Sequence, residues 1–115
     1  MNSNPRFLQG AFPFKGRGLA EPAPLDDCPS YTVPSDRRGQ LVYFRGGNSS
    51  TELIYALLTR DGEPMRYFPI GAQAGCHIPL RVVEDMPPDT ELAVHLAAPE
   101  NAAGTIVVDI GIIES

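Results

Sequence analysis

Two histidines and one glutamate are the residues whose types and spacing could do chemistry in this chain. His77 and His95 are its only histidines. A hairpin that pairs the segments around them would make them diagonal neighbours on one polar face, with Cβ atoms about 7 to 8 Å apart. Glu91 would lie on the same face. Because imidazole and carboxylate groups bind divalent metals, this pattern allows a metal site of His77, His95 and Glu91, although most surface histidines bind no metal.

Other combinations of reactive side chains are weaker candidates. Cys76 and His77 are consecutive in an expected strand, so their side chains point to opposite faces and cannot form a thiol–base pair. Residues 49–51 have hydroxyl groups but no base positioned beside them in the sequence. The acidic turn at residues 84–91 matches no calcium loop, and residues 71–75 lack the lysine of a phosphate loop. The sequence therefore predicts no catalytic residue and no cofactor other than this metal, and it favours a protein that is not an enzyme.

The elements that would position these side chains are short β-strands. From residue 40 onward, runs rich in β-branched and aromatic residues alternate with turn signals such as Asp61-Gly62. Six strands are expected, and a seventh over 31–33 would extend the set. The six are expected at 41–44, 53–59, 65–70, 76–84, 91–97 and 105–113. With no helical period, this pattern predicts an all-β fold, either a small antiparallel β-sandwich or a jelly-roll-like barrel.

Alternation within the strands predicts which side chains are buried. A hairpin across Pro87-Pro88 would pair the fourth and fifth of these segments, 76–84 and 91–97, and give one apolar face. The expected core residues are Cys76, Ile78, Leu80, Val82, Leu92, Val94, Leu96, Ile106, Val108, Ile110 and Ile112. In residues 53–58 both faces are apolar, so we expect the outer face to be covered by the N-terminal segment or by another subunit.

The spacing of these turns resembles that of immunoglobulin and fibronectin type III sandwiches. The resemblance covers residues 40–115 and includes no Cys, Trp, Cys signature. It therefore implies the fold class alone.

The N-terminal part differs in composition from the rest. Six of the 12 prolines lie in the first 34 residues, where no strand or helix period is sustained. We therefore predict an extended arm over 1–39, followed by a β-sandwich domain over 40–115. The arm also carries large apolar side chains and a cation that could contact a groove on its own domain or on a neighbour. These are Phe7, Leu8, Phe12, Phe14 and Arg17.

Charge is divided unevenly along the chain, whose net charge is −5. Residues 1–47 carry six Lys or Arg and four Asp or Glu, whereas residues 48–115 carry three and ten. The acidic part would repel a phosphate backbone, so nucleic-acid binding is disfavoured. The weakly basic N-terminal part could instead lie across an acidic surface of its own or a neighbouring copy.

Membrane insertion and secretion are also disfavoured. The chain has no apolar run of about 18 residues and no secretory signal pattern. We therefore expect a cytoplasmic protein or a component of an assembled particle. In the reducing cytosol, Cys28 and Cys76 would be free thiols rather than a disulfide.

These observations favour a non-enzymatic structural or accessory protein. It would form a homo-oligomer or dock on a larger protein assembly, such as a shell, a capsid or an enzyme complex. The expected contacts are the arm and an apolar sheet face that includes Leu53, Tyr55 and Leu57. The first alternative is a metal-dependent enzyme or metal carrier. The second is a carbohydrate- or peptide-binding module that uses exposed tyrosines such as Tyr43 and Tyr67 together with Tyr55.

Overall fold

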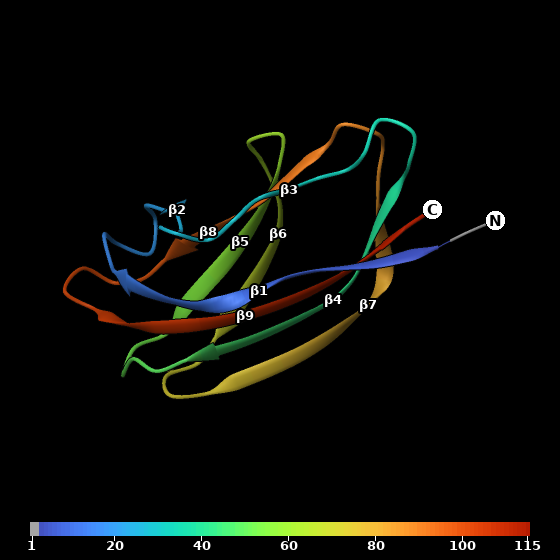
Figure 1. Ribbon diagram of the computed structural model, residues 1–115. Coiled ribbons are helices and arrows are strands. Elements are labelled where there is room, and N and C mark those ends of the chain that lie inside the picture. Colours follow the sequence, from blue (N-terminus) through green and yellow to red (C-terminus); the bar gives the residue numbers. More distant parts are fainter. Residues whose placement is uncertain (1–2) are drawn as a thin grey trace.

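The structure is a computed structural model that describes residues 3–115, and its strands form two antiparallel sheets (Figure 1). The first sheet has the order β1-β9-β4-β7, and the second has the order β2-β8-β5-β6, with β3 also paired to β8. The strands are β1 (Asn4–Lys15), β2 (Ala23–Pro24), β3 (Tyr31–Thr32), β4 (Gly39–Asn48), β5 (Ile54–Arg60), β6 (Glu63–Ile70), β7 (Gly75–Met86), β8 (Glu91–Ala97) and β9 (Ala103–Glu114). The predicted all-β sandwich is therefore confirmed. Residues 3–115 contain no helix that is long and apolar enough to span a membrane.

The path of the chain decides between the sandwich types. Only β5 and β6 are consecutive strands that pair with each other, and β1 lies beside the last strand, β9. From β6 onward, every connection crosses from one sheet to the other. With β2 and β3 counted as one interrupted edge strand, this is the strand order of a double-sheet jelly roll.

The crossing connections overturn the predicted hairpin across Pro87-Pro88. Strand β7 pairs with β4 in the first sheet, whereas β8 pairs with β5 in the second. The prediction was wrong because a proline-rich turn between two strands fits a crossing between sheets as well as a hairpin. Local sequence does not distinguish these two connections.

The core lies between the two sheets. The inward residues of β8 and β9 are buried as alternation predicts: Leu92, Val94, Leu96, Ile106, Val108, Ile110 and Ile112. Strand β7 departs from the expectation, because Cys76, Ile78 and Leu80 are only half-buried and Val82 is exposed. This strand lies at the edge of its sheet, and its pairing to β4 is interrupted between Pro79 and Glu84, so these side chains are covered less than those of the inner strands.

An aromatic pair connects the sheets at the centre of the core. The rings of Phe44 in β4 and Phe68 in β6 are stacked with their centroids 4.3 Å apart. Gly46 is required beside them, because a Cβ there would lie 2.7 Å from Cδ1 of Ile70 and 2.8 Å from the Phe44 ring. The absence of a side chain thus allows β4 to approach the second sheet closely.

The structure does not confirm a separate arm over 1–39. Strand β1 pairs with β9 over its whole length, from Asn4 to Lys15, and β2 and β3 pair with β8. Leu8, Phe12 and Phe14 belong to the core of the molecule. The segment that lacked a sequence period therefore supplies edge strands to both sheets (Figure 1).

Edge pairing explains how a proline-rich segment can form strands. Thr105 exchanges hydrogen bonds with Ser49, at 2.7 and 3.1 Å, so its backbone groups point toward β4 and away from β1. Pro13 lies opposite Thr105, and its nitrogen therefore points to the open edge of β1. The register between β1 and β9 is uninterrupted, and Pro5 and Pro13 are separated by an even number of positions. The nitrogen of Pro5 therefore also points to the open edge. Neither proline removes a hydrogen bond from the sheet.

Prolines follow the same rule elsewhere in the fold. The nitrogen of Leu25 donates to the carbonyl oxygen of Val94 in β8 at 3.0 Å, so the preceding Pro24 faces away from β8. The remaining strand prolines lie in β6 and β7, which are also edge strands, whereas β4, β5, β8 and β9 contain no proline. The open edges therefore lack backbone donors at several positions, which disfavours the addition of another strand.

A buried carboxylate joins the two sheets at the end of β9. The side chain of Glu114 is only 3% exposed and lies 3.3 Å from Nε of Arg6 in β1. The hydroxyl of Tyr31, in β3 of the other sheet, donates a hydrogen bond to the same carboxylate. Partial burial and this carboxylate raise the pKa of Tyr31. The interaction ties the short strand β3 to the first sheet.

Candidate functional site

The outer face of the second sheet is the candidate functional site. In β5, the side chains of Ile54, Ala56 and Leu58 belong to the core, so Tyr55 and Leu57 point to the outer face. Leu57 is nevertheless only 3% exposed and is not part of the core cluster. An outward-pointing leucine is thus covered by its neighbours on the surface of the sheet.

Two tyrosines and a histidine surround Leu57. The register places Leu57 opposite Tyr67 in β6 and opposite His95 in β8. The rings of Tyr55 and Tyr67 are 5.7 Å apart and tilted, and Tyr67 remains 58% exposed. We call this surface the docking face and define it as Tyr55, Leu57, Tyr67, Pro69, His95 and Ala97.

Charged side chains lie around this face rather than on it. Glu63 and Glu91 begin their strands, and Arg60 ends β5. Arg66 is directed toward the first sheet, where its Nε lies 2.6 Å from Oε1 of Glu84. The middle of the docking face therefore presents aromatic and aliphatic groups without a charged residue.

The loop between β1 and β2 borders one side of the docking face. The hydroxyl of Tyr55 donates to the carbonyl oxygen of Leu19 at 2.7 Å, and the nitrogen of Gly18 donates to the carbonyl oxygen of Ala98 at 2.8 Å. The sequence predicted a cover over residues 53–58 from the N-terminal segment or from another subunit. The N-terminal segment supplies part of it, and Tyr67 stays open to solvent.

The outer face of the first sheet has a different chemistry. The hydroxyl of Tyr43 donates to Oδ1 of Asp109 at 3.0 Å, and NH1 of Arg45 lies 3.9 Å from the other oxygen of that carboxylate. The Arg45 guanidinium also lies 5.3 Å from the Tyr43 ring centre, and His77 meets the same ring edge to face at 6.0 Å. The Tyr43 ring rests on Gly111, where a Cβ would clash with it.

The structure separates the residues that were predicted to bind a partner. Leu8, Phe12 and Phe14 are buried in the core, so they are not available to a partner. Phe7 is 58% exposed, but it lies on the outer side of the first sheet. Leu53 is exposed next to β5, close in sequence to Tyr55 and Leu57 of the docking face. Arg17 is exposed in the loop between β1 and β2.

The structure does not bring the predicted metal ligands together. His77 lies in β7 of the first sheet, whereas His95 and Glu91 lie in β8 of the second. Among residues 3–115, no group of three or more His, Cys, Asp or Glu side chains is arranged to hold a metal ion. The predicted geometry depended on the hairpin across Pro87-Pro88, which does not form.

Two residues of this face were singled out from the sequence. Tyr55 and Leu57 stood out because both faces of β5 are apolar. Tyr67 was considered only as a possible ligand-binding aromatic residue, and His95 only as a metal ligand. Their place beside Leu57 follows from long-range pairing, for which the sequence carries no local signal.

Comparison with known proteins supports the fold. No protein family and no curated protein matches the sequence of this chain. Among solved structures, a chain in the structure of infectious bursal disease virus, Gx strain, matches 99% of this chain with a TM-score of 0.51 and 9% identity. A chain of the Gt strain matches 97% with a TM-score of 0.44 and 10% identity. An exo-β-1,3-galactanase from Phanerochaete chrysosporium matches 99% with a TM-score of 0.39 and 12% identity.

These similarities concern the fold alone. This chain spans 32% and 35% of the two viral chains and 29% of the galactanase chain. The match to the Gx strain agrees with the double-sheet architecture derived from the strand order. At 9% identity it carries no site residue over to this chain.

Proposed function

We propose that this protein is a non-enzymatic structural or accessory subunit that docks on a protein assembly through the docking face. The observation that carries the proposal is Tyr67, which is 58% exposed and lies beside Tyr55 on a surface whose middle has no charged residue. Aromatic side chains such as Tyr55 and Tyr67 are enriched at protein interfaces, because they bury a large area at little cost in conformational entropy.

The sheet edges support docking through a face. Strand addition needs an open edge with free backbone donors, and the edges of β1 and β2 carry prolines that point outward. A partner would therefore gain more from covering the docking face than from extending a sheet. Burial of apolar surface contributes roughly 25 cal/mol per Å².

The fold and the thiols are consistent with this role. Double-sheet jelly rolls are common in viral capsid domains, and the chain of the Gx strain shares this architecture. Cys28 and Cys76 do not form a disulfide in this structure, and free thiols are compatible with a reducing compartment. We therefore propose that the protein acts in the cytoplasm or in an assembled particle. The partner to test first is a second copy of the same chain.

A matched pair of substitutions tests the proposal. Tyr67 and Phe7 are both 58% exposed, but they lie on opposite outer faces. Molar mass should be measured by light scattering from micromolar to millimolar protein for the wild type, Tyr67→Lys and Phe7→Lys. We expect the wild type to self-associate, Tyr67→Lys to weaken association at least about tenfold, and Phe7→Lys to leave it unchanged.

Two other results of the light-scattering comparison would change the proposal. Loss of association only in Phe7→Lys would move the interface to the first sheet and overturn the proposed face. A wild type that stays monomeric throughout would exclude self-assembly and leave docking on a different protein. In that case, the same two variants would be compared for binding to the assembly.

The adjacent tyrosines keep a second function open. Tyr67 is exposed and Tyr55 is half-buried beside it, so a carbohydrate or peptide could contact this aromatic pair. Saturable changes in the signals of both tyrosines on adding an oligosaccharide, without a change in molar mass, would favour this alternative.

A further inference from the structure

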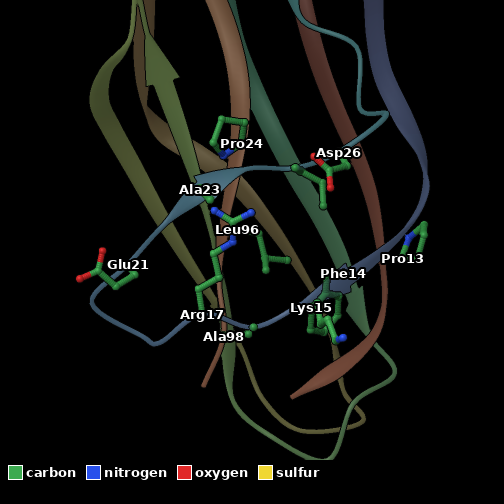
Figure 2. A pocket seen from close by; sticks show the side chains of 12 residues that line it. Pro13, Phe14, Lys15, Arg17, Glu21, Ala23, Pro24, Asp26, Leu96 and Ala98 are labelled. Atoms are coloured by element: carbon green, nitrogen blue, oxygen red, sulfur yellow. The ribbon is translucent and has the colours of Figure 1, made fainter. Parts of the chain in front are cut away.

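A cavity lies at one end of the molecule, on the side where the edges of both sheets are open. Its volume is about 310 Å³, which is at the lower end of the range for small-molecule sites. It is bounded by the end of β1, the loop that follows, β2 and the end of β8 (Figure 2). The docking face does not include this space.

The floor of the cavity is apolar. Phe14, Leu25, Leu96 and Ala98 all line it, and all four are buried. They come from β1, the residue after β2, β8 and the residue after β8, so their positions are fixed by both sheets. A small aliphatic group could contact this floor without any rearrangement of the strands.

The rim carries charges of both signs. Lys15 and Arg17 are cationic, and Glu21 and Asp26 are anionic. Within residues 3–115, none of these four side chains forms an ion pair. Four other arginines behave differently. Arg6, Arg38, Arg45 and Arg66 each pair with a carboxylate.

The directions of the charged rim side chains indicate which of them could contact a molecule in the cavity. Figure 2 shows Arg17 extending from the loop toward Ala23 and Leu96, across the cavity lining. The carboxylate of Glu21 points away from the other labelled side chains. Arg17 and Asp26 are therefore the opposite charges best placed to contact a bound molecule.

We propose that this cavity binds a small zwitterion with an aliphatic side chain, such as a free apolar amino acid. Arg17 would pair with the carboxylate, because a guanidinium offers two parallel donors to that group. Asp26 would accept hydrogen bonds from the ammonium group. The aliphatic side chain would lie on Phe14, Leu96 and Ala98. A ligand with a single charge would leave one of the two rim groups without a partner.

Three related molecules test the charge requirement by nuclear magnetic resonance titration of amide signals. Leucine has both charges, 4-methylpentanoate lacks the ammonium group, and 3-methylbutylamine lacks the carboxylate. We expect leucine to shift signals of residues 14–26 and 96–98 with a dissociation constant on the order of 1 mM. Each analogue should bind about tenfold more weakly, because one charge-assisted contact is lost.

Variants assign the two contacts. Arg17→Met should weaken leucine about tenfold and leave 3-methylbutylamine unchanged, whereas Asp26→Asn should weaken leucine and leave 4-methylpentanoate unchanged. Arg81→Met, at an exposed position in β7, is the matched control and should bind leucine like the wild type. Amide signals of the free variants would show that each still folds.

Two results would overturn the proposal. One is the absence of saturable shifts with leucine at tens of millimolar. The other is equal binding of all three molecules with no effect of Arg17→Met, which would reduce the cavity to an apolar depression. Neither result bears on the docking face, because self-association is measured without leucine.

Discussion

The two outer faces of this sandwich differ in chemistry although both lie on similar antiparallel sheets. On the first, Tyr43, Arg45 and Asp109 satisfy one another through a hydrogen bond, an ion pair and a cation–ring contact. On the second, Leu57 lies below two tyrosines with no charged residue in the middle of the face. The polar groups of the first face thus pair with one another, although Phe7 and Val107 are exposed beside them. The second face instead carries two adjacent tyrosines, and an apolar or aromatic surface of this kind gains free energy when it is covered.

The difference shows that sheet geometry alone does not set the chemistry of an outer face. Both sheets have prolines in their edge strands, and both contribute side chains to the core. What distinguishes the faces is the identity of a few outward side chains on β4 and β9 of the first sheet and on β5, β6 and β8 of the second. Three substitutions, at Leu57, Gly111 and Tyr43, test this contrast, and the effect at Leu57 should be the largest.

Leu57→Ala should destabilise the protein more than a substitution at an exposed site on the other face. Leu57 is 3% exposed, whereas Val107 in β9 is 51% exposed. We expect Leu57→Ala to lower the free energy of unfolding by about 2 kcal/mol, because buried contacts are lost and a cavity remains. Val107→Ala should lower it by less than about 0.5 kcal/mol. Chemical denaturation of both variants measures the difference.

Equal small effects in both variants would contradict this contrast. They would mean that Leu57 gains little from the side chains that cover it. The tyrosines of the docking face would then have no apolar support beneath them, and the face would be an ordinary solvated surface.

The fold was predictable where a pattern is local. Alternation in β9 predicts Ile106, Val108, Ile110 and Ile112 as core, because a strand covered on one face must place every second side chain inward. The apolar outward residues of β5 likewise indicated a covered surface. Each of these inferences requires only one strand and its own period.

The remaining features were not predictable because they depend on pairing between distant segments. Strand β1 has no period of its own, and it is a strand because β9 offers it an edge where Pro5 and Pro13 cost no hydrogen bond. The hairpin prediction for β7 and β8 failed for the same reason, and the metal site failed with it. The cavity combines residues of β1 and β8 that no local pattern brings together.

Gly111→Ala tests the packing of the first face. A Cβ at Gly111 would clash with the Tyr43 ring, whereas a Cβ at Gly47 would lie 3.6 Å from Cβ of Val107, an ordinary contact. We expect Gly111→Ala to lower the free energy of unfolding by about 1.5 kcal/mol and to displace Tyr43 from Asp109. Gly47→Ala, the matched control, should change it by less than about 0.5 kcal/mol. A stable Gly111→Ala variant with unchanged Tyr43 signals would show that the ring does not need this glycine.

Tyr43→Phe should have the smallest effect, and the size of that effect depends on pH. Burial and the hydrogen bond to Asp109 raise the pKa of Tyr43 above its ordinary value of about 10. A raised pKa means that the folded state holds the proton more tightly. Its contribution to stability is therefore complete below pH 10, and it declines as pH rises from about 10 through the folded-state pKa.

The variant should accordingly be slightly less stable than the wild type near pH 7, by about 0.5 kcal/mol, because one partly buried hydrogen bond is lost. Above pH 10, the stability of the wild type should fall more steeply than that of Tyr43→Phe. Part of the decline should remain in the variant, since the pKa of Tyr31 is raised in the same direction. Urea denaturation across this pH range measures both curves. Parallel curves would mean that the Tyr43–Asp109 contact does not hold the phenol proton, and the first face would then be less self-contained than the contrast requires.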